Sequence, residues 1–145
     1  MNSSPIGVPK HGPKRRMSEA AYLLDASAAL AIMFGEPGAD LVVERKARSA
    51  ISSVNLAEVV AKLHDRGVDH EDIALNLVAL DCPVVPFDRE MALDAGALRS
   101  KTRQFGLSLG DRACLATAQA RGLTVLTADR AWARIDLGIE VEIIR

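Results

Sequence analysis

Short apolar runs alternate with segments of helical periodicity along most of this chain. The run Tyr22–Leu24 ends at Asp25 and precedes an alanine-rich stretch, which predicts a buried strand leading into a helix over 27–34. Four more short strands are predicted, at 50–54, 83–87, 123–127 and 139–144. Helices are predicted between them, at 39–48, 56–64, 70–80, 89–104, 111–120 and 130–134. This alternation predicts an α/β fold with a small, mostly parallel sheet of four to five strands flanked by helices.

Several predicted helices begin at residues that favour helix N-termini. Asp25 or Ser27 can cap the helix after the first strand, and Asn55 is the predicted cap of the helix that follows the second strand. Ser108 and Asp111 match a capping box before the last long helix. That helix has small or apolar residues on nearly every face, which predicts that it is buried all round.

The first 19 residues differ from the rest of the chain. They contain several Pro and Gly residues and the basic run Lys14–Arg16, with no apolar stretch. We therefore expect a flexible basic leader over residues 1–19 and one domain over residues 20–145. A chain of 145 residues with 49% hydrophobic side chains is long enough to form one substantial core.

Charge and cysteine content narrow the class of partners and the compartment. The formal net charge is -1, so any contact with RNA or DNA has to be local rather than driven by a global field. Cys82 and Cys114 are far apart and form no Cys/His cluster, which favours a reducing compartment, and we expect the cytoplasm. Because no segment has the length and hydropathy of a membrane span, no membrane partner is expected.

Four acidic residues fall where a parallel sheet would bring them together. Asp25 and Asp129 directly follow predicted strands, Glu58 lies one turn into the helix after another strand, and Asp111 begins the buried helix. Since the carboxyl ends of parallel strands meet at one edge, these four carboxylates could converge there. Crowded carboxylates repel one another unless a cation neutralises them. Oxygen ligands without His or Cys favour Mg²⁺ or Mn²⁺.

Each of these residues also has an ordinary structural interpretation. Asp25 and Asp129 could serve only as helix caps, and Glu58 could lie on a solvated helix face. Asp111 is the hardest to explain in this way, because it opens a helix with little polar surface. The sequence alone leaves these alternatives open for each residue taken singly.

Four motifs in order resemble PIN-domain ribonucleases, particularly the VapC-type toxins of toxin-antitoxin pairs. They are Leu-Leu-Asp-Ala-Ser-Ala at 23–28, Asn-Leu-Ala-Glu-Val at 55–59, Leu-Gly-Asp-Arg-Ala-Cys-Leu-Ala-Thr-Ala at 109–118 and Val-Leu-Thr-Ala-Asp-Arg-Ala-Trp at 125–132. The resemblance covers nearly everything after the leader. By position it implies that the catalytic and metal-binding residues are Asp25, Glu58, Asp111 and, as a more variable fourth, Asp129. It also implies that the polar residues beside them are Ser27, Asn55 and Thr127.

The function implied by this resemblance is a metal-dependent ribonuclease that hydrolyses RNA phosphodiester bonds and acts as the toxin of a toxin-antitoxin pair. Mg²⁺ or Mn²⁺ would be the cofactor, and a cognate antitoxin and a second copy of the chain would be partners. The helices over 27–48 contain Leu and Val residues that could form the apolar dimer contact. The alternative is a PIN fold without catalysis that serves as a binding or scaffolding module.

An acidic site repels the RNA backbone, so cations are expected around it. The candidates for RNA binding are Arg99, Lys101, Arg103, Arg112 and Arg130. With aromatic residues at 3%, base stacking would contribute little, and RNA shape would matter more.

Two other α/β classes with acidic sites fit less well. A response-regulator receiver domain needs a phosphoacceptor Asp after a middle strand and a Lys after a late one, whereas the chain has Pro83–Phe87 and Asp129 at those places. A haloacid-dehalogenase phosphatase needs Asp-x-Asp after the first strand, and the sequence Asp25-Ala26-Ser27 lacks the second Asp.

Overall fold

A computed structural model describes residues 17–145 as helices packed on both faces of a five-stranded sheet, with strand order β3-β2-β1-β4-β5. All neighbouring strands are parallel, which confirms the predicted α/β fold. The strands are β1 (Tyr22–Leu24), β2 (Ser49–Ser52), β3 (Val84–Val85), β4 (Thr124–Thr127) and β5 (Val141–Ile143).

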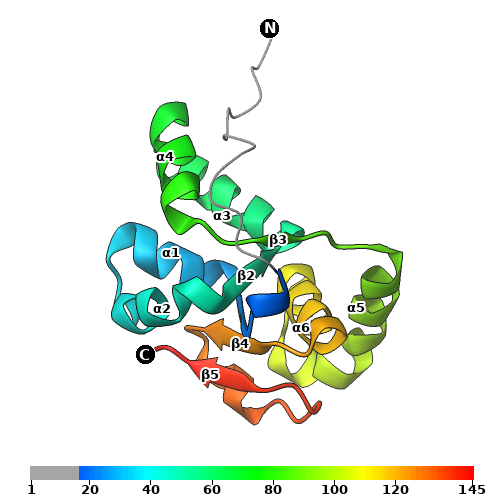
Figure 1. Ribbon diagram of the computed structural model, residues 1–145. Coiled ribbons are helices and arrows are strands. Elements are labelled where there is room, and N and C mark those ends of the chain that lie inside the picture. The colour runs from blue at the N-terminus through cyan, green and yellow to red at the C-terminus, as the bar shows by residue number, and fades with distance from the viewer. Residues whose placement is uncertain (1–16) are drawn as a thin grey trace, which may run out of the picture.

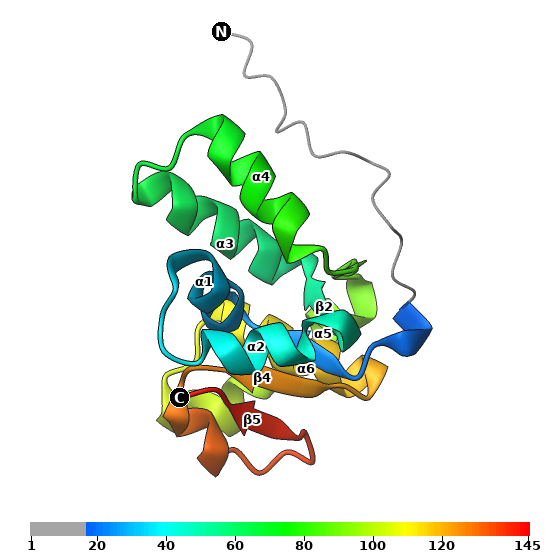
Figure 2. The same ribbon diagram turned by 60° about the vertical axis from the view of Figure 1, so that its left-hand side comes forward.

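The helices cover both faces of the sheet (Figures 1 and 2). The α-helices are α1 (Ala26–Phe34), α2 (Ala39–Arg45), α3 (Ser53–Asp65), α4 (His70–Leu80), α5 (Arg89–Thr102) and α6 (Leu109–Arg121). The 3-10 helices are η1 (Met17–Glu19), η2 (Lys46–Arg48), η3 (Arg103–Phe105) and η4 (Arg130–Arg134). Helices α1 to α4 lie on one side and α5 and α6 on the other, and α4 runs beside α3 (Figure 2).

Two hydrophobic cores follow from the alternation of side chains along the strands. Leu24 faces one core together with apolar residues of α1 to α4, and Leu23 faces the other core with those of α5, α6 and η4. Both leucines are fully buried. Because both faces of the parallel sheet are covered, the middle residues of β2 and β4 are apolar on both faces rather than alternating apolar with polar.

Helix α3 begins earlier than predicted. Asn55 does not cap α3: β2 ends at Ser52, whose side chain accepts a hydrogen bond from the backbone N–H of Val54 at 3.2 Å. Serine and asparagine are both favoured at helix N-termini, so local chemistry does not decide between Ser52 and Asn55. The burial of Asn55 does. Asn55 lies in the first turn of α3 and is 1% exposed, and its side chain bonds to groups on α3 and α6. Asp25 does cap α1, as predicted.

Other element ends differ by a few residues from the predictions. The last strand is shorter than 139–144, and α5 gives way to the 3-10 helix η3 after Thr102. Residues 17–19 of the expected leader form η1, and the other leader residues lie outside the described part of the chain. Such shifts are common where helix ends tighten into 3-10 turns.

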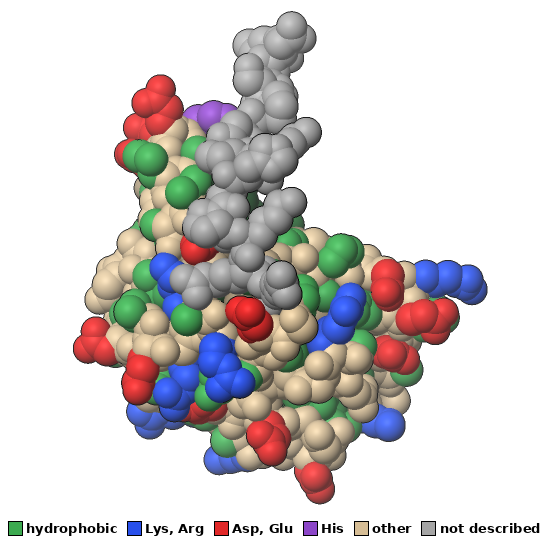
Figure 3. All heavy atoms as spheres, viewed as in Figure 1, with side chains coloured by type: hydrophobic (Ala, Val, Ile, Leu, Met, Phe, Trp, Pro, Cys, Tyr) green, Lys and Arg blue, Asp and Glu red, His purple; other side chains and the backbone are tan. Residues whose placement is uncertain are grey.

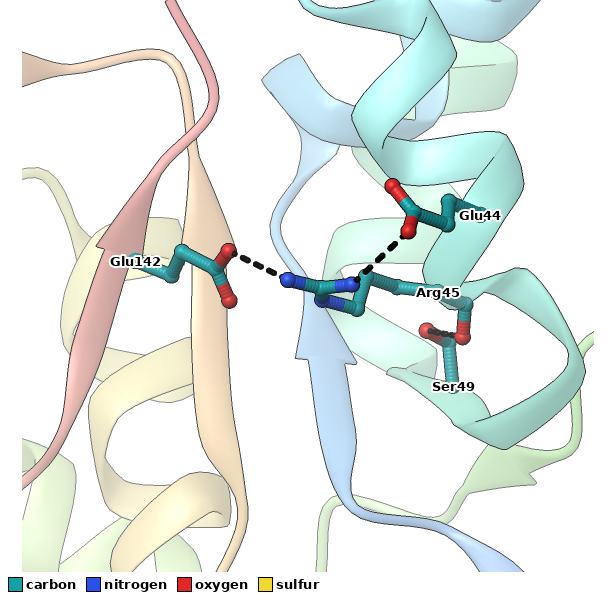
Figure 4. Close-up of polar contacts among 4 residues, drawn as sticks. All are labelled: Glu44, Arg45, Ser49 and Glu142. Carbon is teal, nitrogen blue, oxygen red and sulfur yellow. Dashed lines mark hydrogen bonds and ion pairs between the residues drawn. The ribbon is translucent and has the colours of Figure 1, made fainter.

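Arg45 fastens the end of α2 to the sheet (Figure 4). Its Nη2 donates to Oε1 of Glu142 on β5 at 3.0 Å, and Nη1 lies 3.6 Å from a carboxylate oxygen of Glu44. The guanidinium also lies over the ring of Tyr22, 5.4 Å from its centroid. The hydroxyl of Ser49 donates to the Arg45 carbonyl at 2.9 Å. Arg45 thereby joins α2 to both β1 and β5.

The described surface carries no dominant charge on the face in Figure 3. Acidic and basic side chains are interspersed there over most of the visible elements.

Within residues 17–145 no single helix could span a membrane by length and hydropathy, although α1 and Ala39–Arg48 together pass that test across a bend of 110°.

Candidate functional site

Asp25 occupies the junction between β1 and α1, and three groups hold its carboxylate. Oδ1 accepts hydrogen bonds from the backbone N–H of Ala28 at 2.9 Å and from the hydroxyl of Ser27 at 2.6 Å. Oδ2 accepts a hydrogen bond from the hydroxyl of Thr127 at 2.5 Å. Because β1 pairs directly with β4, Thr127 reaches Asp25 across 102 residues of sequence. Asp25 is 6% exposed, so these contacts fix its orientation.

The same hydroxyls connect Asp25 to the turn that carries Asp129. The backbone N–H of Ala128 donates to Ser27 Oγ at 2.9 Å, and that of Asp129 donates to Thr127 Oγ1 at 3.1 Å. The Asp129 carboxylate is exposed and accepts from the backbone N–H of Ala131 at 3.0 Å, which caps η4. Asp129 is therefore linked to Asp25 through Thr127 rather than by direct contact.

Glu58 is held between α3 and α6. Nδ2 of Asn55 donates to Oε1 of Glu58 at 2.7 Å and to the carbonyl of Gly110 at 3.1 Å. A Cβ atom at position 110 would overlap the Glu58 carboxylate, so only glycine leaves room for it there. Glycine is disfavoured inside a helix, and its place directly before Asp111 is the sequence signal that could have identified this close approach.

Asp111 lies in the first turn of α6 and is partly exposed. Its Oδ2 accepts from the backbone N–H of Ser108 at 2.9 Å, and Ser108 Oγ accepts from the backbone N–H of Asp111 at 3.1 Å. These reciprocal bonds confirm the predicted capping box. The structural role does not exclude a chemical one, because a carboxylate has further lone pairs that these bonds leave free.

The electrostatics show that three of the four carboxylates are neighbours. Burial raises the pKa of Asp25, hydrogen bonds from Ser27, Thr127 and Ala28 oppose the rise, and the Asp111 carboxylate adds to it. The buried Cys114, one helical turn after Asp111, has a pKa raised well above that of a free thiol. Burial is the main cause, followed by repulsion from Asp25, Asp111 and Glu58. All three carboxylates therefore lie near enough to this thiol to raise its pKa.

The acidic residues and Asn55 supply oxygen atoms that could hold a metal ion. Within residues 17–145 no three His, Cys, Asp or Glu side chains already form a metal-binding group. The carboxylates of Glu58 and Asp111 instead bond to Asn55 and Ser108. Beside Glu58, the Oδ1 atom of Asn55 is buried without a hydrogen-bond partner. A set of oxygen donors with one buried oxygen unpaired fits a hard cation such as Mg²⁺ or Mn²⁺.

The basic candidates occupy different environments. Arg112 is 8% exposed; its Nη1 donates to the carbonyl of Ala95 on α5 at 3.0 Å and its Nε is buried without a partner. A buried guanidinium cannot reach a phosphate of bound RNA, so Arg112 is removed from the candidates for RNA binding. Arg130 is exposed, and its Nε donates to the carbonyl of Arg145 at 2.9 Å. The remaining candidates are exposed near the end of α5: Arg99, Lys101 and Arg103.

Asp25→Asn should increase the free energy of unfolding of the metal-free protein at pH 7. For a carboxyl group whose pKa is raised by folding, the folded state binds more protons than the unfolded state, so stability falls as pH rises from about 3.8 through the folded pKa. Above that window the wild type retains a desolvated charge, which Asn removes while still accepting from Ala28. Urea unfolding in EDTA across pH 4 to 8 measures this effect. A variant less stable than wild type at pH 7 would show that hydrogen bonds to the carboxylate outweigh its desolvation.

The acidic residues follow the carboxyl ends of the central strands, which is where open parallel α/β sheets bind their ligands. The family model for the PIN domain matches residues 22–137, and the chain therefore belongs to the PIN domain family. A comparison with curated proteins gives no match.

Solved structures of toxin-antitoxin complexes share this fold. A chain of the DNA-bound VapBC complex from Salmonella typhimurium has a TM-score of 0.69 and 22% identity, over 87% of this chain and 99% of that chain. For VapBC2 from Rickettsia felis, bound to a promoter DNA fragment, the TM-score is 0.68 and the identity 19%, over 86% and 99%. For VapBC-5 from Mycobacterium tuberculosis the TM-score is 0.57 and the identity 28%, over 87% and 98%.

Proposed function

We propose that this protein is a metal-dependent endoribonuclease that acts as the toxin of a toxin-antitoxin pair. The observation that carries the proposal is the proximity of three acidic residues in a PIN domain: Glu58 lies against Gly110, the residue before Asp111, and the carboxylates of Asp25, Glu58 and Asp111 all raise the pKa of Cys114. Burying or crowding charge in this way is unfavourable for folding, which favours a chemical role for the cluster. The similar structures from toxin-antitoxin complexes support the assignment as a toxin.

In this proposal Asp25, Glu58 and Asp111 hold Mg²⁺ or Mn²⁺, directly or through water, and Asp129 places a second ion or orients the attacking water. A cation held there would lower the pKa of water and offset charge on the scissile phosphate. The chain's part is to fix the carboxylates before substrate arrives: Ser27 and Thr127 fix Asp25, and Asn55 fixes Glu58. The unpaired Oδ1 of Asn55 is available to accept a hydrogen bond from a water molecule of the site.

RNA is the proposed substrate, and its backbone would be held by basic residues around the acidic edge. Arg99, Arg103 and Arg130 are exposed and remain candidates, whereas Lys101 lines a groove together with the acidic residues Asp94 and Asp136. With aromatic side chains at only 3% of the chain, recognition would depend more on RNA shape than on base stacking.

A cognate antitoxin and a second copy of the chain are the proposed protein partners. The similar structures from Salmonella typhimurium and Mycobacterium tuberculosis are VapBC complexes, which supports the antitoxin. The Leu and Val residues over 27–48 expose less apolar surface for a homodimer contact than expected. Val43 is 56% exposed, whereas Leu30 and Val42 are buried. Light scattering of the isolated chain distinguishes a dimer from a monomer, and a monomer would remove the dimer from the proposal.

The proposed activity is tested by incubating the purified protein with a mixed pool of structured and single-stranded RNA. Cleavage is expected with Mg²⁺ or Mn²⁺ and is expected to stop when EDTA is in excess. Cleavage that persists in EDTA would contradict the metal-dependent mechanism. RNA left intact in every metal, together with RNA binding, would favour the alternative of a PIN fold that binds without cleaving.

A further inference from the structure

The C-terminal end of α5 lies beside the N-terminal end of α6. Two contacts fix this antiparallel arrangement: the hydroxyl of Thr117 on α6 lies 3.8 Å from Sδ of Met91 on α5, and Arg112 bonds to the carbonyl of Ala95. Later residues of α5 therefore pair with earlier residues of α6. The exposed basic residues at the end of α5 are consequently brought to the edge where Asp111 lies.

A hollow of about 150 Å³ opens at this end of α5. Its lining consists of Arg99, Thr102, Arg103, Gly106 and Leu107. Asp111 lies five positions after Gly106 in the chain, so the Cα atoms of these two residues are within about 18 Å of each other.

The three basic residues at this end of α5 line two different surface hollows. Arg99 and Arg103, one helical turn apart, line the hollow. Lys101 lines a different groove of about 580 Å³, together with the acidic side chains of Asp94 and Asp136. The charges that could attract an anion to the hollow are therefore those of the two arginines, and Lys101 faces carboxylates instead.

The hollow has an excess of unpaired positive charge. Within residues 17–145 neither Arg99 nor Arg103 takes part in an ion pair or a side-chain hydrogen bond. Two like charges one turn apart repel each other unless an anion lies between them. Their two full charges exceed the roughly half negative charge of the α5 C-terminus.

The other polar groups of the hollow are already used. The Thr102 hydroxyl donates to the carbonyl of Leu98 at 2.8 Å, and the backbone N–H of Gly106 donates to the carbonyl of Arg103 at 3.1 Å. The donors left for a ligand are therefore the two guanidinium groups. Guanidinium groups suit phosphate oxygens, because their paired N–H donors match the spacing of those oxygens.

We propose that Arg99 and Arg103 together bind one backbone phosphate of an RNA strand, at a nucleotide a short distance from the bond that is cut. This inference rests on the proposed function, because it takes the ligand to be the substrate strand. The subsite holds the strand against the edge that carries Asp111 and offsets the repulsion of the backbone by the carboxylates. Lys101 has no part in it.

The test measures RNA binding without cleavage. Binding of a fluorescent single-stranded RNA of mixed sequence to the Asp111→Asn protein is followed by anisotropy in EDTA, over a series of salt concentrations. Arg99→Gln and Arg103→Gln should each weaken binding about 3- to 10-fold at low salt and lower the slope of log K against log salt by about 0.7. The double variant should lose little more than either single variant, because both arginines bind the same phosphate. Lys101→Gln is the matched control and should leave the slope unchanged.

Three results would overturn the subsite. They are an unchanged slope in both arginine variants, an equal loss in Lys101→Gln, and a parent protein that does not bind RNA at low salt. None of these bears on whether the wild type cleaves RNA with Mg²⁺, so the proposed function can stand without the subsite. Conversely, binding that depends on Arg99 and Arg103 in a protein that never cleaves would support the subsite and refute the nuclease. Circular dichroism of each variant excludes loss of fold as the cause.

Discussion

Asp111→Asn should abolish metal-dependent RNA cleavage and leave the protein folded. The amide can still accept the hydrogen bond that Ser108 N–H donates to the carboxylate, so the N-terminus of α6 remains capped. The loss of negative charge beside Asp25 and Glu58 weakens the proposed metal site. Loss of a residue that merely supports a metal ligand reduces affinity or activity about 10- to 100-fold, so loss of a direct ligand should reduce cleavage by at least about 100-fold. Initial cleavage rates with saturating RNA measure the effect.

Ser108→Ala is the control that separates capping from chemistry. It removes the hydroxyl that accepts from the backbone N–H of Asp111 but leaves the carboxylate in place. The variant should lose about 1 kcal/mol of unfolding free energy and keep most of its cleavage activity below its unfolding temperature. If Asp111→Asn instead fails to fold, or if Ser108→Ala loses activity to the same extent, Asp111 acts as a cap and its assignment as a metal ligand is wrong.

Gly110→Ala should reduce cleavage by about 10-fold or more while changing stability little. An alanine Cβ would occupy the space of the Glu58 carboxylate. Because that carboxylate is the far end of a flexible side chain, it can move away at small cost to the fold. Alanine is also the better helix former by about 1 kcal/mol, which offsets part of this cost. The expected signature is therefore loss of activity without loss of stability, measured by cleavage rates and urea unfolding.

Gly96→Ala provides the matched control for this substitution. Gly96 lies inside α5, and a Cβ there would meet no atom within 4 Å. The variant should be more stable than wild type by about 0.5–1 kcal/mol and equally active. Equal activity of Gly110→Ala and wild type would show that the position of Glu58 against Gly110 is not needed for cleavage.

The sequence predicts the fold well because the relevant signals are local. The apolar run before Asp25 and its cap on α1 depend on residues within one helical turn, and so does the reciprocal pair Ser108 and Asp111. The parallel sheet follows from the alternation of such strands with helices. The strands that place the acidic residues could therefore be predicted without any tertiary information.

The contacts that shape the candidate site depend on packing between distant segments. As a cap, Asn55 is as plausible as Ser52, and only the approach of α6 gives its side chain the carbonyl of Gly110 as a partner. The same approach explains why position 110 is glycine. Helical periodicity already places Lys101 on the same face of α5 as Asp94, seven residues earlier. Only the packing of distant segments brings Asp136 to that face.

The bond between Asp25 and Thr127 also determines when during synthesis the site can form. The two residues are 102 positions apart and belong to the paired central strands β1 and β4. At about 5–20 residues per second, a ribosome adds Thr127 roughly 5–20 s after Asp25. Until then the centre of the sheet is incomplete, and Asp25 lacks the hydroxyl that holds one of its oxygens. A nascent chain therefore cannot have the assembled acidic site until most of the protein has been made.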